Sequence, residues 1–120
     1  MRIAFDVDDT IWKIRIREVD GRMVGDQVPD YDLIQVLRWF ANNGDEVFVW
    51  SAGGIDYAQM IVDKLGLTDL VKVIPKGKFR DRGNPSNIDI TFDDDSAEQI
   101  GKVNITVKRD SILKEEFLKD

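Results

Sequence analysis

The sequence contains no cysteine and no histidine. Disulfide bonds and thiolate zinc sites are therefore excluded. An enzyme built from this chain would have to move protons with carboxylates, lysine or tyrosine instead of imidazole. A bound metal would have oxygen ligands, and this favours Mg²⁺ over zinc.

The sequence also lacks an apolar run long enough to span a membrane, and Met1 leads directly into an apolar strand rather than a signal peptide. We therefore expect a cytoplasmic protein without a membrane partner. Basic residues are fewer than acidic ones, 17 against 23, so general binding to nucleic acid is not expected. The length of 120 residues, 42% of them hydrophobic, fits a single domain over residues 1–120.

Strand-like and helix-like segments alternate along the chain. Apolar segments at 2–5, 46–50, 70–74, 88–92 and 103–107 predict strands, and helical spacing predicts helices over 33–41, 58–65 and 112–119. Residues 11–25 alternate in polarity around Asp20-Gly21 and predict a β-hairpin flap after the first strand. This pattern predicts an α/β fold with a three-layer, Rossmann-like, mostly parallel sheet that is covered on both faces.

Side chains with chemical uses follow four of the predicted strands. Asp6 and Asp8 leave the first strand on the same side, because side chains alternate along an extended chain. The later strand ends carry Ser51, Lys76 and the pair Asp93-Asp94. Ligands of parallel sheets bind beyond the carboxyl ends of the strands, so we expect these side chains to lie together.

This set of residue types fits a phosphoryl-transfer site. One carboxylate can attack phosphorus, and a second can protonate the leaving oxygen and then deprotonate a water molecule. An acid pair on a neighbouring strand can hold Mg²⁺, which binds a phosphoryl oxygen. A hydroxyl and an ammonium group can contact the remaining phosphoryl oxygens.

The four segments resemble the motifs of haloacid dehalogenase (HAD)-like phosphohydrolases. The Asp-x-Asp-x-Thr motif corresponds to Asp6-Val7-Asp8-Asp9-Thr10, and the strand followed by Ser or Thr corresponds to residues 47–51. The lone basic residue corresponds to Lys76, and the strand that ends in an acid pair corresponds to residues 90–94. The resemblance spans residues 3 to 107.

The resemblance implies a Mg²⁺-dependent phosphatase that works through an aspartyl-phosphate. Asp6 would be the nucleophile and Asp8 the general acid and base. Mg²⁺ would be bound by Asp6, by the backbone carbonyl of Asp8 and by the pair Asp93-Asp94. The phosphorylated substrate would be held by Ser51, Ala52, Lys76 and Thr10.

Three assignments stay open from the sequence. Lys78 and Arg80 compete with Lys76 for the role of the lone cation, and Asp94-Asp95 could replace Asp93-Asp94 as the metal-binding pair. We prefer Asp93-Asp94, because the residue before Asp93 continues the strand alternation. Thr10 also fits a residue that shapes its turn by local hydrogen bonding.

The segments after the first two strands are too short for a cap domain, so the chain resembles capless members, whose open sites admit bulky phosphorylated substrates. Lys13, Arg15 and Arg17 fall on one face of the hairpin. We consider two interpretations of this face. It could attract an anionic substrate, or it could be a charged edge that discourages strand pairing.

A response-regulator receiver is the alternative function. Receivers are α/β modules of similar length, with an acid pair after strand one and Ser/Thr and Lys at later strand ends. They accept their phosphoryl group on an Asp after the third strand, where this chain has Ile74-Pro75. They also have a helix directly after strand one, where this chain predicts a hairpin.

Overall fold

The computed structural model describes residues 1–76 and 83–108. The predicted helix over 112–119, Lys78 and Arg80 lie outside these residues. The described elements are β1 (Arg2–Asp6), β2 (Trp12–Val19), β3 (Arg22–Pro29), α1 (Tyr31–Asn42), β4 (Glu46–Trp50), α2 (Ile55–Lys64), β5 (Lys72–Val73), β6 (Ile90–Asp93) and β7 (Val103–Thr106).

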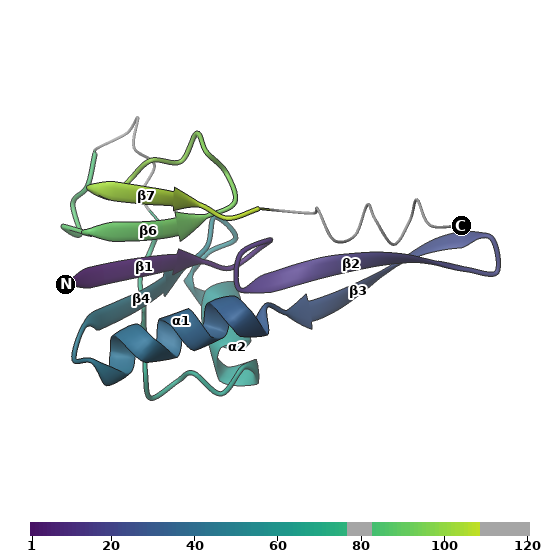
Figure 1. Cartoon of the computed structure of the whole chain (residues 1–120), viewed down its shortest axis with the longest axis horizontal. Helices are drawn as coiled ribbons and strands as arrows, with labels where there is room; N and C mark the ends of the chain where they lie inside the picture. The colour runs from purple at the N-terminus through teal and green to yellow at the C-terminus, as the bar shows by residue number, and fades with distance from the viewer. Residues whose placement is uncertain (77–82, 109–120) are drawn as a thin grey trace.

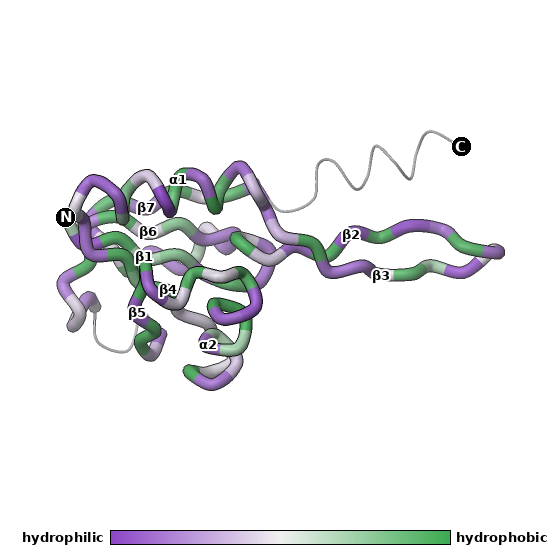
Figure 2. Tube along the Cα trace, turned by 90° about the horizontal axis from the view of Figure 1, so that it is seen from below, coloured by the Kyte–Doolittle hydropathy of each residue, from purple (hydrophilic) through white to green (hydrophobic). Residues whose placement is uncertain are grey.

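Five strands form a parallel sheet in the order β5-β4-β1-β6-β7 (Figures 1 and 2). The predicted parallel α/β sheet is therefore confirmed. Numbered along the chain, these five strands lie in the order 3-2-1-4-5, as in the first five strands of a doubly wound sheet. The connections run outward from β1 to β4 and β5, and then return to β6 and β7. The direction thus reverses between β1 and β6, which is where ligands bind in such sheets.

Two predicted strands are shorter in the structure. The third was expected over 70–74, and β5 comprises only Lys72–Val73. The fourth was expected from residue 88, and β6 begins at Ile90. A side chain satisfies the backbone there: Asn84 accepts from the amide of Ile88 and donates to its carbonyl, each at 2.8 Å. Ile88 is thus held by this turn, and its carbonyl also accepts from the amide of Lys102 at 3.1 Å.

Both helices of the described residues cover the same face of the sheet. Phe5 of β1 stacks on Phe92 of β6 on this face, with ring centroids 4.5 Å apart. Burial of each large apolar side chain contributes roughly 1.5–3 kcal/mol. The core on this face includes Ile3, Phe5, Val47, Val49 and Phe92 from the sheet, Ile34 and Leu37 from α1, and Ala58, Ile61 and Val62 from α2.

The opposite face is covered by connecting segments. Ala4, Phe48 and Trp50 point to this face and pack with Ile74, Ile88 and Ile100. The predicted cover on both faces is therefore observed, but within residues 1–76 and 83–108 no helix forms the third layer. The connection from β6 to β7 is short and mostly polar, so it covers the sheet with a single buried side chain, Ile100.

Gly101 lets this connection lie directly on the sheet. An added Cβ at Gly101 would lie 2.8 Å from Cγ2 of Thr91 and 3.1 Å from the carbonyl oxygen of Val103. The amide of Gly101 also donates to Oδ1 of Asn104 at 3.0 Å. The position therefore needs a residue without a side chain.

The predicted hairpin is confirmed as an antiparallel pair, β2 and β3. Its turn residues, Asp20 and Gly21, have φ of 52° and 77°, and two such residues in sequence produce a turn that matches the twist of the strands. The hairpin is longer than predicted, because pairing continues to Trp12 and Pro29. It projects from the body of the molecule, with apolar and polar residues alternating along it (Figures 1 and 2).

The cations of the hairpin have partners nearby. Lys13 lies 2.9 Å from Asp30, and Arg17 forms an ion pair with Asp26. Two of the three charges in the suggested attractive face are thus balanced by neighbouring acids. Asp30 also accepts a hydrogen bond from the amide of Leu33 and caps α1, so it joins the base of the hairpin to the helix.

Among the described residues, no helix has the length and apolar character needed to cross a membrane.

Candidate functional site

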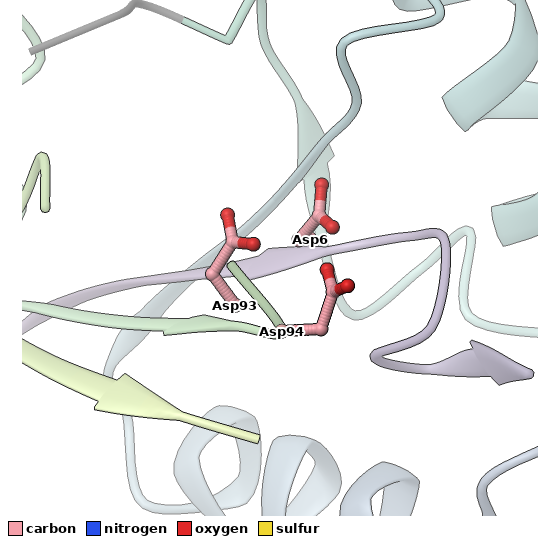
Figure 3. Close-up of side chains that lie close together, drawn as sticks. All are labelled: Asp6, Asp93 and Asp94. Atoms are coloured by element: carbon pink, nitrogen blue, oxygen red, sulfur yellow. The ribbon is translucent and has the colours of Figure 1, made fainter. Parts of the chain in front are cut away.

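Three acids converge at the point where the sheet connections reverse direction. Asp6 ends β1, Asp93 ends the adjacent strand β6, and Asp94 follows it. One carboxylate oxygen from each acid lies within 4.8 Å of the others (Figure 3). Asp6 and Asp93 are only 6% and 4% exposed, so their charges lie largely out of water. The predicted convergence of these strand ends is therefore observed.

These acids could hold a metal ion. All three donors are carboxylate oxygens, which are the ligands that hard cations such as Mg²⁺ and Ca²⁺ prefer. Buried carboxylates at such short range also repel one another, and a cation would remove that repulsion. The donor chemistry and the charge of the cluster thus both fit an oxygen-ligated divalent cation.

Lys76 reaches into the same cluster. Its Nζ lies 2.7 Å from Oδ2 of Asp93 and 3.2 Å from Oδ1 of Asp6, and its side chain is 7% exposed. The residue predicted from the strand end is thus at the acidic cluster. An ammonium group fixed between two carboxylates can contact an anion that binds beside them.

Burial changes the pKa values of Asp6, Asp93 and Lys76. Desolvation, aided by the charge of Asp93, raises the pKa of Asp6 to about 7, although Lys76 opposes the change. Desolvation also raises the pKa of Asp93, again against the hydrogen bond from Lys76. Burial by itself would lower the pKa of Lys76, but the charges and hydrogen bonds of the two acids outweigh it and raise that pKa. Both acids are therefore harder to ionise than an acid in water, and a bound cation would favour their charged forms.

The turn after β1 places Asp8 at the edge of the cluster. The amides of Thr10 and Trp12 both donate to the carbonyl of Val7, and the amide of Asp9 donates to the carbonyl of Trp12. Asp9 has a φ of 57°, a value that Asp tolerates better than most residues. This tight turn leaves the side chain of Asp8 exposed.

An open cleft of about 190 Å³ joins these residues. Its lining consists of Asp6, Asp8, Asp9, Ser51, Ala52, Lys76, Asp93, Asp94, Asp95 and Glu98. Every residue predicted for the site is in this set except Thr10. Ser51 is buried, and its Oγ accepts a hydrogen bond from the amide of Gly53 at 3.0 Å.

Thr10 contributes to its turn through its backbone amide, and its side chain does not reach the cleft. It is fully buried, it does not line the cleft, and its hydroxyl has no hydrogen-bond partner in the part of the chain that the structure describes. Its backbone amide, by contrast, donates to Val7 and helps to close the turn. The side chain therefore packs beneath the site, where a bound substrate would not reach it.

Asp95 contributes differently from its two neighbours. Its carboxylate accepts a hydrogen bond from the amide of Ala97 at 2.9 Å, and its own amide donates to Oδ1 of Asp93 at 3.0 Å. Asp95 thus stabilises the turn after β6 and orients Asp93. This geometry favours Asp93-Asp94 over Asp94-Asp95 as the pair that faces Asp6.

Sequence reasoning missed Tyr57. Its hydroxyl donates to Oδ1 of Asp8 at 2.5 Å, across 49 positions in the chain. Partial burial, together with this hydrogen bond, raises the pKa of Tyr57 to about 12, so the hydroxyl keeps its proton at neutral pH. In the sequence, Tyr57 directly precedes the helix predicted over 58–65, and only this position, shortly after Ser51, could have indicated the contact. Asp9 and Glu98 were also not predicted to line the cleft, and Asp95, which lines it too, was considered only as an alternative metal ligand.

No model of a known protein family matches the chain, and no curated protein is significantly similar to it.

Proposed function

We propose that the chain is a Mg²⁺-dependent phosphatase of the HAD-like type, which hydrolyses phosphoric monoesters through an aspartyl-phosphate on Asp6. The observation that carries the proposal is the convergence of the Asp6, Asp93 and Asp94 carboxylates around Lys76, in an open cleft. Asp8 and Ser51, the other two reacting or binding groups that the reaction needs, line the same cleft.

In the first half of the reaction, a carboxylate oxygen of Asp6 bonds to phosphorus while the bond from phosphorus to the ester oxygen breaks. Asp8, in its acid form, gives its proton to the departing oxygen. The products of this half are an alcohol, phosphorylated Asp6 and the carboxylate of Asp8. The ammonium group of Lys76 and the hydroxyl of Ser51 stabilise the charge on the phosphoryl oxygens.

In the second half, the carboxylate of Asp8 removes a proton from a water molecule. The water oxygen bonds to phosphorus as the bond from phosphorus to Asp6 breaks. Inorganic phosphate leaves, Asp6 returns to its carboxylate form, and Asp8 again carries a proton. Asp8 thus acts as an acid in the first half and as a base in the second, and both roles require it to lie beside Asp6.

The residues that would hold Mg²⁺ are Asp6, Asp93 and Asp94 with the backbone carbonyl of Asp8. When bound, the ion supplies charge neutralisation for the cluster and polarises a phosphoryl oxygen. The cleft is open, and the hairpin is the element that separates β1 from α1. Both features support a capless site that accepts bulky phosphate esters.

The order of the strands argues against the receiver alternative. Receivers have the flavodoxin-like order 2-1-3-4-5, whereas this sheet has the order 3-2-1-4-5. In addition, β1 pairs with β6, the strand that ends in the acid pair, and β6 is the fourth strand of the sheet in chain order. This strand order supports the phosphatase proposal over the receiver alternative.

Release of inorganic phosphate tests the proposal. A panel of sugar, nucleotide, nucleic-acid-end and peptide phosphate esters is incubated with the protein in Mg²⁺ or in a chelator. We expect Mg²⁺-dependent release that Asp6→Asn abolishes. Lys76→Ala should lower kcat by about 10²–10³-fold, as for loss of one charge-stabilising donor.

The matched controls are Asp69→Asn, an exposed acid outside the cleft, and Lys102→Ala, an exposed lysine paired with Asp89. Both controls should keep full activity. Substantial turnover by Asp6→Asn would contradict the assignment of the nucleophile. A phosphoryl group that stays on the protein without release of phosphate would instead favour the signalling alternative.

A further inference from the structure

The proposed reaction demands more of Asp8 than of any other side chain, because its carboxyl group must donate a proton and later accept one. Its side chain is nevertheless exposed at a turn. Among residues 1–76 and 83–108, its carboxylate has one hydrogen-bond partner, the hydroxyl of Tyr57, at 2.5 Å from Oδ1. Without this partner, the carboxylate would rotate about its side-chain bonds, and a misoriented carboxylate transfers protons more slowly.

The α2 helix holds Tyr57 in place. Tyr57 lies in the first turn of α2 and packs, partly buried, against the core between the sheet and the helices. The loop before α2 leaves room for the ring at Gly53, where an added Cβ would lie 3.2 Å from Cδ2 of Tyr57 and 3.3 Å from Oγ of Ser51. The phenol is therefore a donor on a rigid element, and it lies beside the loop that carries Ser51.

We infer that Tyr57 is a positioning residue for the proton-transfer step of the proposed phosphatase reaction. Its hydroxyl donates a hydrogen bond to Oδ1 of Asp8. Oδ2 is then the oxygen that gives a proton to the leaving group and takes one from water. Tyr57 itself does not line the cleft and has no role in binding the phosphoryl group. This inference rests on the proposed function, because it concerns the same reaction.

The dependence of the rate on the leaving group tests this role. Esters with a good leaving group, such as p-nitrophenyl phosphate, need little help from a general acid, whereas alkyl phosphates need a proton on the departing oxygen. The ratio kcat/KM reports only the steps up to release of the leaving group, so it isolates the step in which Asp8 acts as an acid. For Tyr57→Phe, we expect kcat/KM for an alkyl phosphate to fall by about 10–100-fold, part of the usual contribution of a general acid. With p-nitrophenyl phosphate, kcat/KM should fall by less than about 3-fold.

The matched control is Tyr31→Phe, since Tyr31 is the other tyrosine of the chain and is 71% exposed at the start of α1. It should leave both rates unchanged. Adding Tyr57→Phe to Asp8→Asn should cause little further loss with the alkyl phosphate, because the two side chains act as a unit. Thermal melts of each variant would identify a general loss of folding, which would lower both rates together.

The outcomes separate the two proposals. If the natural chain hydrolyses both esters and Tyr57→Phe lowers both rates equally, or neither, the positioning role is wrong and the phosphatase proposal stands. If Tyr57→Phe raises KM while kcat is constant, Tyr57 binds substrate instead. If the natural chain releases phosphate from neither ester in Mg²⁺, the proposed function fails, and the role of Tyr57 fails with it.

Discussion

Replacing Asp6 by asparagine should stabilise the ion-free protein at neutral pH. The pKa of Asp6 rises from its ordinary value of 3.8 to about 7, first through burial and then through the charge of Asp93. Between these two values the folded state binds more protons than the unfolded state. The free energy of unfolding therefore falls as the pH rises through this range, and the full penalty is present above about pH 7.

The magnitude follows from the size of this change. A difference of about three pH units corresponds to about 4 kcal/mol, at roughly 1.4 kcal/mol for each unit. An asparagine at position 6 removes this penalty but also removes the charge that faces Lys76, and its amide oxygen can still accept a hydrogen bond from that lysine. We therefore expect a net gain of about 2–4 kcal/mol at neutral pH and little change near about pH 4.

Urea unfolding in a chelator, followed through the buried Trp50, measures this effect at a series of pH values. The natural protein should lose stability between about pH 4 and about pH 7, and Asp6→Asn should flatten that slope. Asp69→Asn, at an exposed position, is the control and should keep the natural slope. Equal slopes for Asp6→Asn and the natural protein would refute the reasoning, as would stability that rises with pH.

Three further predictions concern the metal, the core and the loop that covers the sheet. Saturating Mg²⁺ should raise the free energy of unfolding of the natural protein by about 3 kcal/mol at a hundredfold excess over Kd, and its Tm with it. Asp93→Asn should lose this gain whereas Asp95→Asn should keep most of it, and the reverse result would make Asp94-Asp95 the metal-binding pair. Phe5→Ala should cost about 3–5 kcal/mol in urea unfolding, because it removes the stacked ring between β1 and β6; a cost below about 1 kcal/mol would contradict that packing. Gly101→Ala should cost about 1–3 kcal/mol, since its methyl group would overlap the sheet, and an unchanged Tm would show that the loop moves freely.

The sheet could be predicted because each strand has a recognisable pattern within a few consecutive residues. β1 and β4 are short apolar segments between polar ones, and their bounds agree closely with the prediction. The hairpin was equally clear, because the Asp20-Gly21 pair between alternating segments has one favoured turn. These features depend on residues that are close together in the sequence.

The layers of the fold were harder to predict. Which face a connection covers depends on the order of the strands, and the sequence contains no direct signal for that order. Ile74, Ile88 and Ile100 come from three separate segments, and only the folded chain shows that they cover Ala4, Phe48 and Trp50. Ile74 and Ile88 lie in segments predicted as strands and Ile100 in a polar loop, so no periodic pattern joins these three residues into one small core.

The candidate site was predictable where strand ends determine it. Asp6, Lys76 and Asp93 meet because the carboxyl ends of neighbouring parallel strands share an edge. Tyr57 was missed for the opposite reason. Its contact with Asp8 depends on how α2 is placed over the sheet and on the space at Gly53, and neither is visible in a helical pattern.

The phosphoryl group on Asp6 offers the most direct test of the central claim. The Asp8→Asn variant, mixed with p-nitrophenyl phosphate and Mg²⁺, should pass through the first half of the reaction and stall before water attacks. Quenching the mixture and reducing it with borohydride converts an acyl phosphate at position 6 to homoserine, which mass spectrometry locates. We predict homoserine at position 6 and at no other position. Release of p-nitrophenol with position 6 still aspartate would contradict the account.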